Sequence, residues 1–237
     1  MHETTLKLAA VALLLTACAK EKQTAATDTT AAPAAAVADT TKGMEADADQ
    51  SHTGSGVPTG YVALTDGADK NITDAKYTVA GGRWEVQTGP AHIIYASKDS
   101  ASGVYAASAS FQQLEKPRHP EAYGIIFGGQ HLDDRAAQRY GYFLVRGTGE
   151  YLIKARDGDH TTTVVDWKAS PDVPKQDASG KAAYDLKVHV APDTVHFFVN
   201  GKLVNAVPKS KLSTDGIAGL RINHNLHVSV TPVTVAK

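Results

Sequence analysis

The sequence predicts an all-β fold, a two-sheet antiparallel sandwich that follows an N-terminal tether without fixed structure. From Tyr61 onward, aromatic and β-branched residues recur in short runs that end at Gly, Pro, Asn or Asp. Amphipathic helical periodicity is nearly absent from the same region. About a dozen such runs in one domain favour two packed sheets over a small closed barrel. We therefore expect one sandwich domain over residues 59–237.

Residues 1–17 have the pattern of a secretory signal peptide. Lys7 lies in a short polar start, and the apolar run 8–15 is too short to span a bilayer as a helix. Leu15-Thr16-Ala17-Cys18 follows and resembles the bacterial lipobox. This resemblance implies cleavage before Cys18 and acylation of that cysteine. The alternative is a buried cysteine in an ordinary hydrophobic helix.

Cys18 is the only cysteine in the chain, so an acylated Cys18 would leave the mature domain without a disulfide. Several acyl chains would anchor the protein to a membrane firmly, whereas one chain binds only marginally. The next residue is Ala19 rather than the aspartate that retains enterobacterial lipoproteins at the inner membrane. We therefore expect an outer-membrane protein of the bacterial cell envelope, on its periplasmic or its surface side.

Residues 18–58 are expected to form the lipidated cysteine and a disordered linker. The segment after Cys18 contains no aromatic residue and is dominated by Ala, Thr, Asp and Gly. Such a composition cannot bury enough apolar surface to offset the entropy of ordering the chain.

The strands are expected where β-forming residues lie between turn-forming residues. In order, these segments are 84–87, 92–97, 103–112, 122–127, 139–146, 151–156, 161–167, 183–190, 194–199, 202–207, 217–221 and 226–235.

The middle of the domain, residues 121–156, is expected to form three consecutive strands. Residues 122–129 are apolar at odd-numbered and even-numbered positions alike, as in a central strand that is covered on both faces. Residues 139–146 instead separate Tyr140, Tyr142, Leu144 and Arg146 from Phe143 and Val145 on the opposite face. One face of this strand should join the core, and the other could line a groove.

Glycine-containing turns connect the predicted strands. Asn200-Gly201 accepts the two positive φ angles of a type I′ turn and is the strongest hairpin signal. Gly147-Thr148-Gly149 and Asp157-Gly158 indicate two further hairpins on either side of the strand 151–156.

The domain resembles the concanavalin A-like lectin/glucanase sandwich, a jelly roll, in its laminin-G-like branch. More narrowly, it is similar to bacterial domains labelled as 3-keto-disaccharide hydrolases. The resemblance covers about residues 60–237 and rests on packing motifs rather than chemical ones. The motifs are Gly82-Arg83-Trp84-Glu85-Val86, Tyr123-Gly124-Ile125-Ile126-Phe127, Tyr140-Gly141-Tyr142-Phe143-Leu144-Val145, Val195-His196-Phe197-Phe198-Val199-Asn200-Gly201-Lys202-Leu203 and Gly216-Ile217-Ala218-Gly219-Leu220. It implies a carbohydrate ligand and allows a calcium ion.

Several kinds of chemistry are not indicated. The formal net charge of −1 gives no field that would draw the chain to nucleic acid. The Glu-x-Asp-x-Glu strand motif of retaining glucanases is absent, so no catalytic residue is assigned. No cofactor is expected beyond the calcium that the resemblance allows.

Metal-ligand candidates are weak. Asp133, Asp134, Asp157 and Asp159 fall in predicted turns, where solvated turn carboxylates are the simpler explanation. On one strand, His224 and His227 would point to opposite faces, which disfavours a shared ion.

Aromatic and polar side chains of the central strands are the candidate ligand-binding residues. Aromatic rings offer flat apolar area for sugar C–H groups, and Arg, Asn and His offer hydrogen bonds to hydroxyls. The candidates are Tyr123, Tyr140, Tyr142, Arg146 and His131. The alternative is that they are ordinary solvent-side residues of a sandwich. Trp84 and Trp167 are expected to pack in the core or at an edge, and the basic loop 116–120 could rim a groove.

The favoured interpretation is a lipid-anchored, non-catalytic envelope module that binds a glycan or another envelope component. A glycoside hydrolase acting on a modified disaccharide is the first alternative. A structural or protein-interaction domain is the second.

Overall fold

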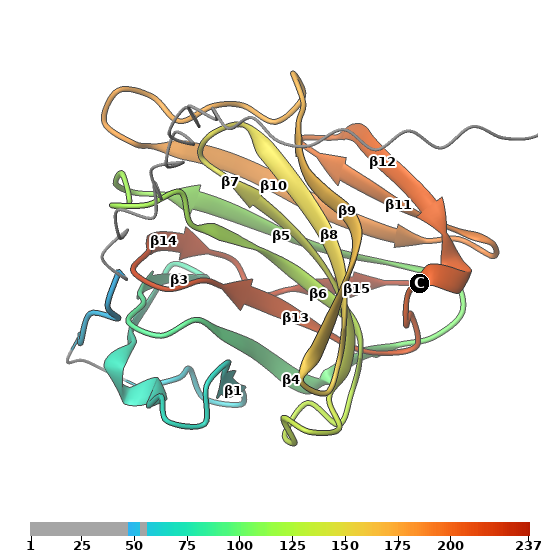
Figure 1. Cartoon of the computed structure of the whole chain (residues 1–237), viewed down its shortest axis with the longest axis horizontal. Helices are drawn as coiled ribbons and strands as arrows, with labels where there is room; N and C mark the ends of the chain where they lie inside the picture. Colours follow the sequence, from blue (N-terminus) through green and yellow to red (C-terminus); the bar gives the residue numbers. More distant parts are fainter. Residues whose placement is uncertain (1–46, 53–55) are drawn as a thin grey trace, which may run out of the picture. The chain divides into compact units, whose positions relative to one another are not determined.

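The computed structural model describes residues 47–52 and 56–237, and these form two antiparallel β-sheets packed face to face (Figure 1). This confirms the predicted all-β sandwich. The predicted signal peptide, Cys18 and most of the predicted linker lie outside the described residues. Within the described ranges, no helix has the length and apolar character needed to cross a bilayer.

One sheet has seven strands, four of which follow one another as a meander, β6 to β9. Across the sheet the order is β1 (Val62–Thr65), β4 (His92–Ala101), β13 (Gly216–Ile222), β6 (Ala122–Gln130), β7 (Arg139–Arg146), β8 (Glu150–Asp157) and β9 (His160–Ala169).

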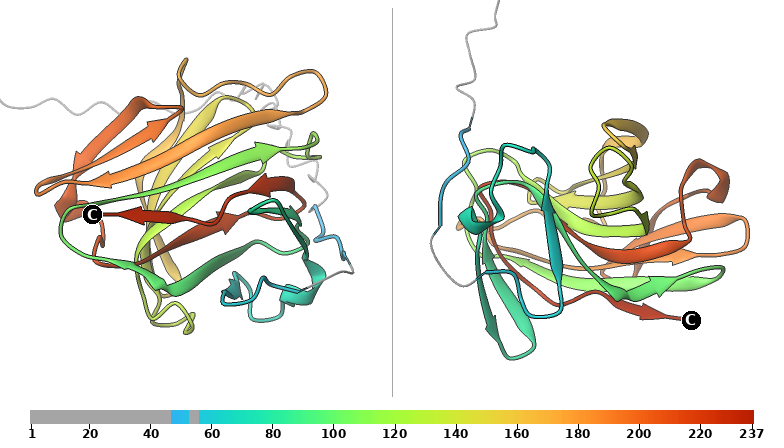
Figure 2. Two further views of the ribbon diagram at one scale, coloured as in Figure 1. Left: turned by 180° about the vertical axis from the view of Figure 1, so that it is seen from behind. Right: turned by 90° about the horizontal axis from the view of Figure 1, so that it is seen from below.

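The second sheet has eight strands and lies behind the first in the sandwich, as the further views show (Figure 2). Its order is β12 (Lys202–Pro208), β11 (Thr194–Val199), β10 (Ala182–Val190), β5 (Tyr105–Gln113), β14 (His227–Val230), β3 (Arg83–Gln87) and β2 (Lys76–Ala80), with β15 (Thr234–Ala236) also paired to β5. Two short 3-10 helices, η1 (Ile72–Asp74) and η2 (Lys209–Lys211), complete the described elements.

Each predicted strand coincides with an observed one, with two differences. The strands β1 and β2 were not predicted from the sequence. The segment 226–235 was predicted as one strand, which is wrong, because it divides into β14 and β15 around residues 231–233. Pro232 lies at this break, and proline has no N–H group for the ladder.

The predicted Asn200-Gly201 hairpin is confirmed between β11 and β12. Asn200 has φ +49° and Gly201 has φ +77°, which are the two positive angles that a type I′ turn requires.

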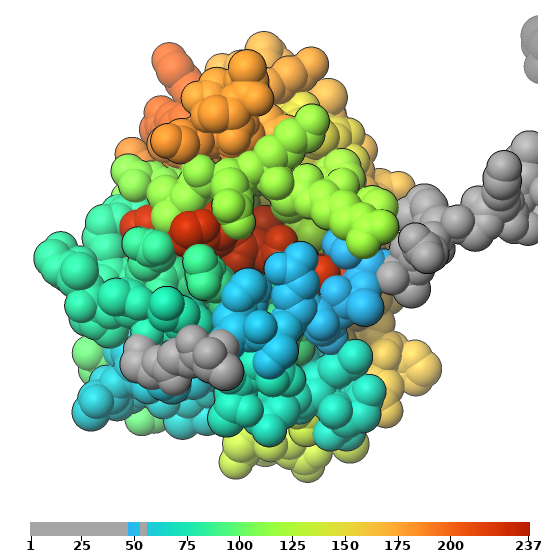
Figure 3. All heavy atoms as spheres, turned by 90° about the vertical axis from the view of Figure 1, so that its left-hand side faces the viewer, coloured from blue at the N-terminus to red at the C-terminus, as the bar shows by residue number. Residues whose placement is uncertain are grey.

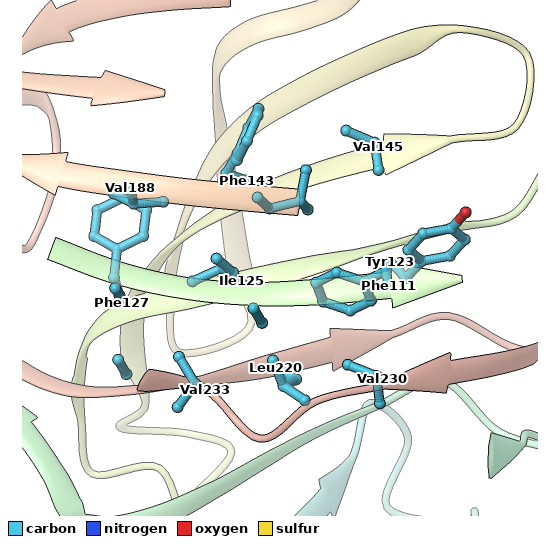
Figure 4. Packing of buried hydrophobic residues seen from close by; sticks show 14 of the residues in the cluster. Phe111, Tyr123, Ile125, Phe127, Phe143, Val145, Val188, Leu220, Val230 and Val233 are labelled. Atoms are coloured by element: carbon cyan, nitrogen blue, oxygen red, sulfur yellow. The ribbon is translucent and has the colours of Figure 1, made fainter. Parts of the chain in front are cut away.

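Aromatic rings from both sheets meet in the core (Figure 4). Tyr123 of the seven-stranded sheet stacks on Phe111 of the eight-stranded sheet, with 5.4 Å between ring centroids. Phe143 packs against Phe197 across the same gap, at 5.2 Å. These rings and the aliphatic side chains around them form one buried cluster between the sheets.

The alternation predicted for β7 is confirmed. Phe143 and Val145 point into the core between the sheets. Tyr140, Tyr142 and Leu144 belong to a separate apolar cluster on the other face of the seven-stranded sheet. β6 is covered on both faces, as its composition predicted, and only Gln130 at its end is exposed.

Candidate functional site

The candidate site is the face of the seven-stranded sheet that points away from the core, here called the outer face. It carries a second apolar cluster that includes Tyr95, Tyr142 and Leu152, with Trp167 packed against it. The polar side chains of this face are arranged around these rings. The face therefore combines aromatic side chains, of which Trp167 is partly exposed, with hydrogen-bonding groups.

An ion pair between Arg221 and Asp66 lies at the centre of the outer face. Arg221 projects from β13, and Asp66 follows β1 directly. The two guanidinium Nη atoms lie 2.7 and 2.5 Å from the two carboxylate oxygens of Asp66, a bidentate arrangement. Arg135 holds the neighbouring Thr65 by hydrogen bonds to its carbonyl and its hydroxyl, at 2.9 and 2.8 Å. These bonds fix the segment that carries Asp66.

The electrostatics of the pair keep both partners ionised. Burial alone would raise the pKa of Asp66, but the hydrogen bonds and charge of Arg221 outweigh it and lower that pKa. Burial likewise opposes the charge on Arg221, yet the contact with Asp66 raises the arginine pKa above its ordinary value. The pair is therefore held ionised, and its Asp66 carboxylate is the more exposed partner, with 35% of its side chain accessible against 12% for Arg221.

A glycine and a tyrosine lie beside Arg221. Gly124 of β6 pairs with Arg221 in the sheet, and a Cβ at Gly124 would lie 2.0 Å from the carbonyl oxygen of Phe143. Only glycine fits there, because the backbone of β7 occupies the space that a side chain would need. The guanidinium carbon lies 5.5 Å from the ring centre of Tyr142, within cation–π range.

A second polar cluster lies near the turn between β7 and β8. The Arg146 guanidinium stacks over the Trp167 ring at 4.1 Å. Glu150 accepts hydrogen bonds from Arg146 at 2.8 Å and from the Thr148 hydroxyl at 2.6 Å. The bond from Thr148, together with Arg146, lowers the pKa of Glu150 although burial acts against this. Arg146 is thus held between a carboxylate and an indole ring.

A hollow of about 280 Å³ lies among the loops at this end of the sheet. Ala122 pairs with Arg146, so the residues that precede β6 and follow β7 lie at the same end. Its lining residues are Lys116, Pro117, Arg118, Pro120, Gly147, Thr148 and Gln176. The basic loop 116–120, which could rim a groove on sequence grounds, lines this hollow.

Tyr123 does not lie on the outer face, which corrects the expectation that it would neighbour Tyr142 there. It pairs with Val145, a core-facing residue of β7, and its ring is 0% exposed between the sheets (Figure 4). A ligand on the outer face cannot reach it.

The other candidates lie on or beside the outer face, with different exposure. Tyr140 is 1% exposed and Tyr142 is 7% exposed, so neither ring offers a flat platform to a sugar. Arg146 is partly exposed, with 22% of its side chain accessible. His131 is exposed at the start of the loop between β6 and β7. Whether any of them binds a ligand stays a prediction.

The weak metal candidates do not converge. Asp134 accepts a hydrogen bond from the Ala136 N–H at 2.9 Å, as an aspartate does when it stabilises a turn. Asp157 forms an ion pair with Arg139 at 2.7 Å. Asp133 and Asp159 are exposed. Among residues 47–52 and 56–237, no group of three or more His, Cys, Asp or Glu side chains is arranged to hold a metal ion.

Asp66 and Arg221 were not predicted from the sequence, and the role of Trp167 was predicted only in part. A signal for Arg221 exists, since it is the only charged residue in the apolar strand Gly216–Ile222. An arginine at such a position needs a partner or a surface. Asp66 gave no comparable signal because β1 itself was not predicted. Trp167 lies on the edge strand β9, as expected, but it also supports Arg146.

Comparison with known proteins identifies the fold and no family. No protein-family model matches the sequence, and no curated protein matches it. Among solved structures, the chain is similar to the carbohydrate-binding module CBM66 from Bacillus subtilis at 16% identity and a TM-score of 0.53, over 76% of this chain and 96% of that one. A Bacillus subtilis protein of unknown function with a galectin-like fold is similar at 11% identity and a TM-score of 0.53, over 74% and 88%. At these identities the similarity shows a shared sandwich fold and nothing about the ligand.

Proposed function

We propose that this protein is a lipid-anchored envelope protein whose sandwich binds carbohydrate through the outer face of its seven-stranded sheet. The observation that carries the proposal is the pairing of guanidinium groups with rings on that face. Arg146 lies over the partly exposed ring of Trp167 and is held by Glu150. Beside them, Arg221 is held by Asp66 near the buried ring of Tyr142, and the Asp66 carboxylate is partly exposed. Fixed donors and acceptors beside apolar surface are what sugar hydroxyls and C–H faces require.

The shared fold supports this proposal as an analogy. One of the similar structures is named as a carbohydrate-binding module, and another is described as galectin-like. A fold hosts many functions, so the residues of the outer face carry the argument here.

The N-terminal sequence supports the anchoring part of the proposal. The apolar run 8–15, the lipobox-like residues 15–18 and the linker that follows are the elements of a bacterial lipoprotein. In this proposal the acylated Cys18 holds the protein to the outer membrane, and the linker lets the sandwich reach its ligand.

The direct test is binding of the full chain to a panel of saccharides and to peptidoglycan. Trp167→Ala and Arg146→Ala should each weaken binding about tenfold, because each removes a contact with partly exposed surface. The matched control is Lys187→Ala, because Lys187 and Phe198 form a similar cation–π pair on the eight-stranded sheet, at 4.3 Å. Absence of binding to every saccharide and to peptidoglycan would refute the proposal.

The two alternatives predict different results in the same samples. A glycoside hydrolase would release monosaccharide from a modified disaccharide. A structural or protein-interaction domain would bind no saccharide, and Trp167→Ala would not change the result of these binding measurements.

A further inference from the structure

Four polar side chains form a strip at one side of the outer face, on β8 and β9. Lys154 pairs with Thr163 across these strands, and Arg156 pairs with Thr161. Directly opposite residues of an antiparallel pair point to the same face, so all four side chains lie together. Arg156 also pairs with Tyr140 of β7. The strip therefore lies beside the group formed by Asp66, Arg221, Tyr140 and Tyr142, here called the central cluster.

The strip differs from the rest of the outer face in having free hydrogen-bonding capacity. Arg156 donates from Nε to the Gly158 carbonyl at 2.7 Å, and its two Nη atoms have no partner in the part of the chain that the structure describes. Lys154 forms no hydrogen bond or ion pair with any described residue, and Thr161 and Thr163 are exposed. Arg221 and Arg146, in contrast, each engage a carboxylate.

The outer face carries more positive than negative charge, although the whole chain has a net charge of −1. Five cationic side chains lie on or beside it, and two carboxylates pair with two of them: Arg135, Arg146, Lys154, Arg156 and Arg221 against Asp66 and Glu150. Two further carboxylates lie near this face: Asp133 acts electrostatically on Tyr95, and Asp157 in the β8–β9 turn already pairs with Arg139. Asp159 of the same turn is exposed.

The Arg156 side chain is partly exposed, and its charge also influences the ionisation of groups in the central cluster. Its charge favours the ionised form of Asp66 and that of the Tyr140 hydroxyl. An anion bound at Arg156 would therefore lie within electrostatic reach of the Asp66–Arg221 pair. The strip and the central cluster would contact one extended ligand together.

We propose that the strip of Lys154, Arg156, Thr161 and Thr163 binds the anionic group of an acidic glycan. This inference rests on the proposed carbohydrate binding and adds the class of ligand. A guanidinium offers two parallel N–H groups to a carboxylate, sulfate or phosphate ester, and the ammonium and hydroxyl groups supply further donors. A uronic acid or a sugar ester of sulfate or phosphate would provide such a group.

The test compares matched polysaccharides by titration calorimetry with the full chain. Polygalacturonate and its methyl ester share a backbone and differ in charge, and dextran sulfate and dextran form a second pair. We expect the charged member of at least one pair to bind about tenfold or more tightly than its neutral partner, because charge-assisted hydrogen bonds are stronger than neutral ones. The pair that responds distinguishes a carboxylate from a sulfate ligand.

The double substitution Lys154→Gln with Arg156→Gln should remove this preference. Lys187→Gln, which removes a cation from the other sheet, should leave it unchanged. If neutral glycans bind as tightly as acidic ones, or if the double variant keeps the preference, the inference is wrong although carbohydrate binding stands. If no glycan of either kind binds, the proposed function itself fails.

Discussion

At the scale of single residues, His224 connects the N-terminal segment 47–52 to the sandwich. Its Nδ1 lies 3.1 Å from Asp49 and its Nε2 lies 2.9 Å from Glu121. The neighbouring Asn225 donates to the Ala48 carbonyl and accepts from the Gln50 N–H. The segment 47–52 lies on the surface of one side of the domain (Figure 3). The hydrogen bond with Glu121, aided by Asp49, raises the pKa of His224 to about 9. The imidazole is therefore charged at neutral pH.

This raised pKa predicts a loss of stability at alkaline pH. An unfolded histidine titrates near pH 6.5, so the contribution of His224 is fully present below about 6.5 and is lost as the pH rises through about 9. His224→Gln should lower the Tm at pH 6 and flatten its decline between pH 6.5 and 9. His160→Gln, at an exposed position, is the control. An unchanged decline in His224→Gln would contradict this assignment.

His92 shows the opposite behaviour inside the domain. Its Nδ1 donates to the Pro90 carbonyl at 2.9 Å, which leaves Nε2 to accept from the Tyr77 hydroxyl. Burial lowers the pKa of His92 to about 4, so the folded state holds this ring neutral. Its depressed pKa reduces stability as the pH falls from about 6.5 toward 4.

Tyr77→Phe should remove the hydrogen-bond donor to the buried His92 Nε2. We expect a loss of about 1–3 kcal/mol in the free energy of unfolding, because an unpaired buried acceptor costs its desolvation energy. Urea denaturation at pH 7.5 measures this loss. Tyr95→Phe, whose hydroxyl makes no hydrogen bond with the described residues, should change stability much less. Equal losses in the two variants would argue against the Tyr77–His92 bond.

At the scale of elements, the β11–β12 hairpin depends on backbone angles that most residues avoid. Gly201 has φ +77°, and no atom lies within 4 Å of the position that an added Cβ would occupy, so strain rather than crowding limits substitution there. Gly201→Ala should destabilise the protein by about 1–2 kcal/mol. Gly56→Ala adds the same methyl group in open space without a positive φ and serves as the control. No difference in Tm between the two variants would contradict this explanation.

Much of the element order could be predicted from the sequence because strand and turn signals are local. Alternation in β7 and Asn200-Gly201 in the hairpin act within a few residues. The division of 226–235 is indicated by Pro232, which was overlooked, whereas the pairing of both β14 and β15 with β5 is visible only in the structure. β2 was missed although Gly81-Gly82, between its five residues and β3, is a two-residue hairpin signal of the same kind as Asn200-Gly201.

The candidate site was less predictable because it depends on register between strands. Tyr123 and Tyr142 are both aromatic residues of central strands, yet Tyr123 pairs with Val145 and so points into the core. The Asp66–Arg221 pair joins residues 155 positions apart. No local pattern encodes such a contact, although a lone arginine in an apolar strand indicates that a partner is needed.

At the scale of the whole molecule, the proposed anchor and the proposed binding face can be tested by separate substitutions. Cys18→Ala should release the protein from the membrane fraction, because acylation needs the thiol. Fractionation of bacterial cells that express the full chain, with labelled fatty acid, measures this. Ala19→Ser, which keeps Cys18, should remain in the membrane fraction. Membrane retention of unlabelled Cys18→Ala protein would exclude the lipid anchor.

Carbohydrate binding by the outer face of the seven-stranded sheet is the central claim. The most direct measurement is a saccharide titration of the full chain and of its Trp167→Ala variant under identical conditions, with thermal melting to show that both are folded. We expect saturable binding by the full chain that weakens about tenfold in the variant. Saccharide binding of equal affinity in the folded variant, or none in either protein, would contradict it.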